Sequence, residues 1–141
     1  MKYLINIKSI LALLLFLFVT SCAGTGSKIK PSISKQTSEF TNLYFVRQGG
    51  YIAGGVLAKI EVNGVEVSKL GTKEYVSYKT SKNFKIKVSG AGIGGFGMGS
   101  DSSSGIADGK NYFYIISVKQ GLFSAKFIIN ETTESGYNQA L

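Results

Sequence analysis

The alternation of apolar and polar residues around one tight turn constrains this fold more than any other feature of the chain. Between residues 56 and 67, apolar side chains stand at every second position before and after Asn63-Gly64. Alternation with a period of two is typical of a strand with one buried face, and Asn-Gly supplies the two positive-φ residues of a type I′ turn. The segment therefore predicts a β-hairpin with one face in a core and one in water.

Further strand-like runs cover most of the chain. β-Branched and aromatic residues are concentrated in residues 42–47, 75–80, 84–88, 112–119 and 122–130. About seven short strands in roughly one hundred residues is the size of a two-sheet sandwich, so we predict an all-β fold, a small antiparallel β-sandwich over residues 39–141. Residues 132–141 are expected to add one or two helical turns capped by Thr132 or Thr133. The expected core includes Phe45, Ile60, Val62, Phe84, Ile86, Val88, Ile116, Val118 and Phe127.

The first twenty-two residues have the pattern of a bacterial lipoprotein signal. Lys2 and Lys8 precede an apolar run from Ile10 to Val19, and small residues come directly before the one cysteine, Cys22. A positive n-region, a short apolar h-region and small residues at the cut are typical of a cleaved signal peptide. We therefore predict removal of residues 1–21 and a covalent lipid, palmitate included, on Cys22, with no other cofactor.

Two alternatives compete with the lipoprotein interpretation: an uncleaved transmembrane anchor, and an ordinary secretory signal in which Cys22 is a buried thiol. An apolar stretch of about ten residues is half of what a spanning helix needs, and the small polar residues around Cys22 favour lipidation. Ala23 resembles the sorting pattern of lipoproteins that move on to the outer membrane. The expected location is the cell envelope, on the outer membrane facing the periplasm if the host is Gram-negative.

Residues 22–38 have neither helical nor strand periodicity and contain the one proline, Pro31. This composition predicts a flexible tether with a root-mean-square reach of about 20 to 25 Å. Ser32 and Lys35 form a literal Ser-x-x-Lys match, but the other motifs of Ser/Lys enzymes are missing. With one cysteine in the chain, no internal disulfide is expected, and core packing alone must hold the domain together.

Residues 90–109 hold eight glycines, including a Gly-x-Gly-x-x-Gly match at Gly90, Gly92 and Gly95. A dinucleotide fingerprint needs a helix at its third glycine, and the residues that follow are poor helix formers. The stretch therefore predicts a mobile connection between sheets. An interpretation between a nucleotide site and a plain connection is that Ile93, Phe96 and Met98 are exposed apolar side chains that contact lipid or a partner.

The chain has no histidine, and its single thiol is assigned to the lipid, so we expect no resident transition metal. Asp101 and Asp108 are candidates for a hard cation, but two carboxylates seven residues apart among serines are more typical of a solvated loop. Because histidine is absent and the carboxylates show no paired spacing, the sequence also offers no general base of the common kind for an enzyme.

Basic residues outnumber acidic ones. Removing residues 1–21 leaves 14 basic and eight acidic residues, a net charge of +6. Such a charge favours anionic envelope polymers such as phosphate-bearing lipopolysaccharide, teichoic acid or peptidoglycan. Lys79, Lys82, Lys85 and Lys87 are expected to form one basic face, although alternating lysines are also typical of the solvated side of a sheet. Nucleic acid is not expected as a partner.

The remaining polar candidates have structural alternatives. Arg47, the one arginine, ends the first strand-like run and is expected to pair with a carboxylate or cap carbonyls, with a second role toward a ligand left open. The tyrosines suggest sugar stacking, but tyrosine is also a favoured strand residue whose ring packs while its hydroxyl reaches water.

Several turn and strand motifs carry a resemblance. The order Leu43 to Arg47, Val62-Asn63-Gly64, Tyr75, Phe84 to Ile86 and Gly109 to Tyr114 resembles the uncharacterised bacterial family numbered twenty-eight forty-six among domains of unknown function. It is more distantly similar to PEGA-type surface modules. The resemblance implies a β-sandwich and an envelope location, and no activity. The chain departs from the family in its Gly90–Gly99 insert and in having Phe84-Lys85 where relatives carry a histidine.

Together these patterns predict a non-enzymatic, membrane-anchored lipoprotein that serves as an interaction or structural module at the envelope, with an envelope protein or a cell-wall polymer as partner. One alternative is a binding module for cell-wall glycan or anionic lipid, and a second is an envelope enzyme. The candidate contact residues are Ile93, Phe96, Met98, Lys79, Lys85, Lys87 and Arg47.

Overall fold

The computed structural model describes residues 24–50 and 55–141, so Cys22 and the expected signal peptide lie outside the described residues. Within them the chain forms eight strands, a single 3-10 turn and a short helix. In order, these are β1 Thr41–Arg47, β2 Leu57–Val62, β3 Val65–Leu70, β4 Tyr75–Thr80, β5 Phe84–Ala91, η1 Ile93–Gly95, β6 Asp101–Gly105, β7 Asn111–Gln120, β8 Ala125–Thr132 and α2 Glu134–Asn138.

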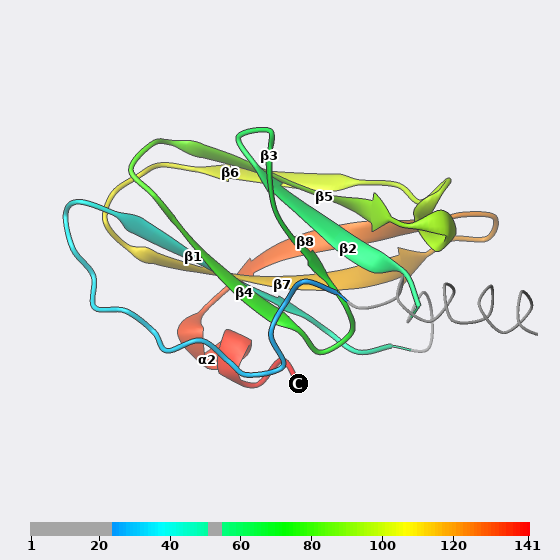
Figure 1. Ribbon diagram of the computed structural model, residues 1–141, viewed down its shortest axis with the longest axis horizontal. Coiled ribbons are helices and arrows are strands. Elements are labelled where there is room, and N and C mark those ends of the chain that lie inside the picture. The colour runs from blue at the N-terminus through cyan, green and yellow to red at the C-terminus, as the bar shows by residue number, and fades with distance from the viewer. Residues whose placement is uncertain (1–23, 51–54) are drawn as a thin grey trace, which may run out of the picture.

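The strands form two sheets that pack face to face, as Figure 1 shows, which confirms the all-β sandwich. One sheet has the order β4-β1-β7-β8 and is called sheet A; the other has the order β3-β2-β5-β6 and is called sheet B. The pairing of β1 with β7 is parallel and departs from the expected antiparallel pattern. A parallel pair needs a long crossover, and the chain supplies it by building all of sheet B between the two strands.

The predicted hairpin is present as β2 and β3. Asn63 and Gly64 have φ angles of 52° and 81°, the two positive values that a type I′ turn requires. Asn63 also fixes the neighbouring strand, because its Oδ1 accepts a hydrogen bond from the backbone N–H of Lys85 at 2.9 Å. The turn residues therefore set both the hairpin and the register of β5.

The strand β6 falls in the glycine-rich stretch where the sequence predicts only a loop. Its residues, Asp-Ser-Ser-Ser-Gly, have low strand propensity. It forms because β5 offers an unpaired edge, along which Asp101 lies opposite Val88 and Gly105 opposite Phe84. A Cβ at Gly105 would stand 2.8 Å from Cε2 of Phe84, so the glycine makes room for the ring.

The main core lies between the two sheets, and all nine predicted core residues belong to it or pack against it. Val118 is the one of these that is only partly buried. Phe45 and Tyr114, on the neighbouring strands β1 and β7, stack with ring centroids 5.4 Å apart. Alternation predicts this core correctly because it identifies the face of each strand that turns inward.

A second apolar cluster covers the outer face of sheet A. It contains Tyr44, Val46, Phe113 and Tyr137, with Tyr137 supplied by α2. The helix begins where expected, since Thr133 is its N-cap and accepts a hydrogen bond from the N–H of Gly136 at 3.1 Å. Because both faces of sheet A are covered at β1, all seven residues of that strand are buried.

Residues 24–40 differ from the tether that the sequence predicts. Ser27 and Tyr75 exchange two backbone hydrogen bonds of 2.8 and 2.9 Å, and the N–H of Ser34 donates to the hydroxyl of Tyr44 at 2.8 Å. Ile33 packs against the outer cluster of sheet A. The segment therefore lies along the domain and is held mainly by backbone groups. Because such contacts depend little on residue type, they leave no periodic pattern in the sequence. Ser32 and Lys35 lie within it in non-helical backbone, which gives no support to the Ser/Lys enzyme interpretation.

Candidate functional site

One end of the sandwich brings together the start of the described chain, a buried charge cluster and the glycine-rich loop. At this end β1, β3, β5 and β7 finish and β2, β4, β6 and β8 begin. We call it the proximal end because the chain enters the domain here. The opposite end, which holds the Asn63-Gly64 turn, is the distal end.

The chain is in close contact with the proximal end from the first described residue, Gly24, onward. A Cβ at Gly24 would stand 2.6 Å from the backbone N of Gly71 and 2.8 Å from the carbonyl of Lys69, closer than a side chain tolerates. The N–H of Thr25 donates to that same carbonyl at 2.8 Å, and its hydroxyl lies 3.0 Å from the hydroxyl of Ser68. Residues 24 and 25 are therefore fixed to the end of β3.

Arg47 ties the two sheets together just beneath this contact. Its side chain is 2% exposed, and Nη1 donates to the carbonyl of Val56 and, at 2.9 Å, to the carbonyl of Leu70. The guanidinium lies 5.3 Å from the ring centroid of Phe127, which suits a cation–π contact. Burial lowers the pKa of Arg47, and the nearby carboxylate of Glu74 opposes that shift. The expected capping of carbonyls is confirmed, and the side chain lies inside the domain.

Glu74 connects this buried cation to the docked segment. Its Oε2 accepts a hydrogen bond from the N–H of Gly71 at 2.7 Å, and its Oε1 lies 3.5 Å from Nζ of Lys28. The carboxylate therefore contacts both the turn after β3 and the incoming chain, and its charge acts to raise the pKa of Arg47. The arrangement fixes residues 24–28 to the turn between β3 and β4.

The glycine-rich loop is built by close backbone contact. A Cβ at Gly95 would stand 2.6 Å from the carbonyl carbon of Gly90, so both positions require glycine. A single 3-10 turn, Ile93–Gly95, stands where a dinucleotide fingerprint needs a helix. The backbone of Gly99 then pairs with the start of β8, accepting from the N–H of Phe127 at 3.0 Å and donating to Ala125 at 2.9 Å. The base of the loop is thus anchored to β8 and differs from the expected mobile connection.

Three large apolar side chains project into solvent from this region. Phe96 is 90% exposed, Leu122 88% and Phe123 95%. We call these three residues the apolar tip. Phe96 is exposed as predicted, whereas Met98 is half-buried and packs against the core, and the side chain of Ile93 lies outside the described part of the chain. Sequence reasoning missed Leu122 and Phe123 because it placed them in a strand; they lie in the turn between β7 and β8.

The basic face expected from four lysines does not form. Lys79 lies on β4 in sheet A, whereas Lys85 and Lys87 lie on β5 in sheet B. Lys82 lies in the turn where the chain crosses from one sheet to the other. The prediction assumes that strands adjacent in sequence are also adjacent in space, and this is wrong for β4 and β5, which lie in different sheets. Lys85 and Lys87 remain together on the exposed face of sheet B, opposite Ser104 and Ser102 of β6.

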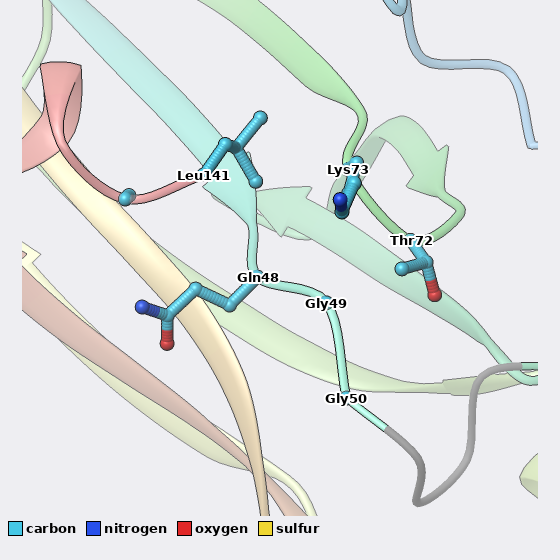
Figure 2. Close-up of a pocket in the computed structure, with 7 residues that line it drawn as sticks. Gln48, Gly49, Gly50, Thr72, Lys73 and Leu141 are labelled. Atoms are coloured by element: carbon cyan, nitrogen blue, oxygen red, sulfur yellow. The ribbon is translucent and has the colours of Figure 1, made fainter.

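A broad hollow of about 650 Å³ lies beside the end of β1. Figure 2 shows Lys73 and Leu141 on the same side of the Gln48–Gly50 backbone, with the side chain of Gln48 pointing away from them. Among the described residues that line it, Lys73 has the one titratable side chain.

The two loop aspartates take separate structural roles. Asp101 accepts a hydrogen bond from the backbone N–H of Ile129 at 3.2 Å and so links β6 to β8. Asp108 lies 2.7 Å from Nζ of Lys110, and the hydrogen bond from Lys110 holds the pKa of Asp108 below its usual value. Over residues 24–50 and 55–141, no cluster of three or more acidic, histidine or cysteine residues is placed to hold a metal ion.

None of the helices in the described part of the chain is long and apolar enough to span a membrane. Comparisons of the sequence with protein-family models and with curated proteins, and of the fold with solved structures, gave no match. The resemblance to the family numbered twenty-eight forty-six and to PEGA-type modules stays a prediction.

Proposed function

We propose that the protein is a non-enzymatic, lipid-anchored module of the bacterial cell envelope whose sandwich is held directly at the membrane surface. The observation that supports this most is the docking of residues 24 and 25 onto the end of β3. The predicted lipid attachment site, Cys22, precedes Gly24 by only two residues.

The reach of the anchor follows from covalent geometry. Two residues span at most about 7 Å when fully extended, far less than the reach of about 20 to 25 Å of a free tether of the expected length. A lipid on Cys22 would therefore hold the proximal end of the domain against the headgroups. Two or three acyl chains bury enough methylenes to make such an attachment effectively permanent, whereas one chain binds marginally.

The proposal is tested through Cys22. In cells fed an alkyne analogue of palmitate, the native chain should be labelled and should sediment with membranes, and Cys22→Ser should lose both properties. Ser32→Ala, a substitution in the docked segment, serves as the control and should behave as the native chain does. A Cys22→Ser chain that is still processed and membrane-bound would contradict lipid anchoring.

A second candidate is the binding of an anionic cell-wall polymer by sheet B. Lys85 and Lys87 are exposed side by side with two serines opposite them on β6. They line a hollow of about 300 Å³ at the distal end together with Asn63, Gly64 and one carboxylate, that of Glu61. With the proximal end at the membrane, this surface would face the cell wall.

Co-sedimentation with purified sacculi tests this second function. The double variant Lys85→Glu/Lys87→Glu should bind more weakly than the native chain, and added salt should weaken native binding. Lys79→Glu makes a charge change of the same sign on sheet A and should leave binding unchanged. Equal losses in both variants would indicate general charge attraction without a site.

A further inference from the structure

We propose that the apolar tip inserts into the same membrane that holds the lipid anchor, and that the lysines beside it contact anionic phospholipid headgroups. This inference rests on the proposed anchoring through Cys22. It assigns to the domain a second membrane contact that is separate from the covalent lipid, and it fixes the orientation of the sandwich on the bilayer.

The three residues of the apolar tip belong to one surface feature. Phe96 directly precedes Gly97, and Leu122 directly follows Gly121; both glycines line the same hollow of about 410 Å³. The pairing of Gly99 with Lys126 holds the glycine-rich loop beside the β7–β8 turn. Large apolar side chains gathered at loop tips and left in water mark a surface that meets lipid or a partner.

The charges beside the tip favour an anionic surface. Lys119 and Lys126 lie directly opposite each other in the register of β7 and β8, and both line that hollow. Like charges opposite each other destabilise a sheet unless an anion offsets them. No ion pair found between described residues involves either lysine, and no acidic residue lines the hollow. Phospholipid phosphates at the membrane surface would supply the missing anions.

The position of the tip matches that of the predicted anchor. β7 continues four residues past Ile116, which pairs with the last residue of β1, so the β7–β8 turn projects about 13 Å beyond β1. Figure 1 shows η1 and the β7–β8 turn together at one end of the sandwich. Residue 24 enters at the same end, beside the end of β3. A bilayer that accepts the lipid therefore lies within reach of the tip.

The chemistry of the tip favours lipid over a protein partner. Aromatic and leucine side chains flanked by lysines are typical of surfaces that lie in the membrane interface. Gly97 has a φ of 81°, and a Cβ there would meet nothing within 4 Å, so the backbone beside Phe96 is not packed against the rest of the domain. Such a surface suits a fluid bilayer, which demands no fixed shape complementarity.

The chain contains no tryptophan, so a single introduced tryptophan reports on its own position without background. The lipidated Phe123→Trp protein is reconstituted on vesicles of phosphatidylethanolamine and phosphatidylglycerol, and its emission is recorded with and without acyl chains brominated along their length. We expect a blue shift and loss of emission through bromine quenching. Phe96→Trp should behave in the same way from the second loop.

Val65→Trp is the matched control, because Val65 is an apolar residue beside the distal turn and is 61% exposed. Its emission should stay water-like and unquenched. Adding Lys119→Glu and Lys126→Glu to Phe123→Trp should reduce quenching, as should replacing both lipids by phosphatidylcholine.

Two failures are distinguishable. If the Phe123→Trp protein binds the vesicles but its tryptophan is unquenched, or is quenched no more than the tryptophan of the Val65→Trp protein, tip insertion alone is overturned. Loss of all the lipidated variants from the vesicles would instead overturn the proposed anchoring and this inference with it.

Discussion

Replacing Arg47 by alanine should destabilise the whole sandwich, because this one side chain joins both sheets at the proximal end. It extends from the last residue of β1 in sheet A and donates to the carbonyls of Val56, just before β2, and of Leu70, the last residue of β3 in sheet B. The substitution removes the hydrogen bonds to both carbonyls and the contact with the ring of Phe127.

The size of the effect follows from what is left behind. Each of the two buried carbonyls that loses its donor costs about 1–3 kcal/mol. The small alanine admits some water to these carbonyls but also loses the contact with Phe127, so we expect a net loss of about 2–4 kcal/mol. Domains of this size are stable by about 5–15 kcal/mol, so the loss is a large share of the total.

Urea unfolding of the Cys22→Ser chain, followed by far-ultraviolet circular dichroism, measures this loss as a fall in midpoint without a change in slope. Arg47→Lys keeps the charge but cannot reach two carbonyls in one plane, so it should recover only part of the stability. Lys85→Ala, an exposed lysine on sheet B, should change stability by less than about 0.5 kcal/mol. A midpoint for Arg47→Ala within the range of Lys85→Ala would refute the assigned role of Arg47.

Three further changes test neighbouring features. Gly24→Ala places a Cβ against the backbone of the β3–β4 turn, so proteolysis within residues 24–40 should become faster, while Gly50→Ala, with nothing within 4 Å, should have no such effect. Lys73 has a φ of 60°, so Lys73→Gly should raise the free energy of unfolding by up to about 1 kcal/mol in urea titrations. Lys110→Ala removes the hydrogen bond that lowers the pKa of Asp108, so the carboxyl carbon of Asp108 should titrate at a higher pH by nuclear magnetic resonance.

Sequence patterns predicted those parts of the fold that depend on whether a side chain faces the core or the solvent. The β2–β3 hairpin follows from alternation and from Asn63-Gly64, and the inter-sheet core follows from the inward positions of each strand. The cap of α2 by Thr133 follows from its short polar side chain. In each case a residue type has a local physical reason to stand where it does.

The parts that were not predicted are made by backbone contacts or by the path between sheets. β6 forms along an open edge without strand-forming residues, and residues 24–40 are held largely through main-chain groups. The expected basic face is absent because the chain changes sheets between Lys79 and Lys85, a crossing that local patterns do not reveal. The sequence pattern places Leu122 and Phe123 in a strand because a run of apolar residues usually indicates a buried strand, whereas here the two residues lie exposed in a turn.

The glycines of the 90–99 stretch explain how one loop can be both fixed and adaptable. Gly90 and Gly95 let two backbone segments touch, and Gly99 lets the loop pair with β8, so the base is held by contacts that a Cβ would block. Phe96 and Gly97 lie between these fixed points, and a Cβ at Gly97 would meet nothing within 4 Å. Because the ring of Phe96 is 90% exposed, it adds nothing to the core of the domain. Any stabilisation from burying this ring must come from a contact outside the domain, and the proximal end is where the predicted lipid anchor would bring a bilayer.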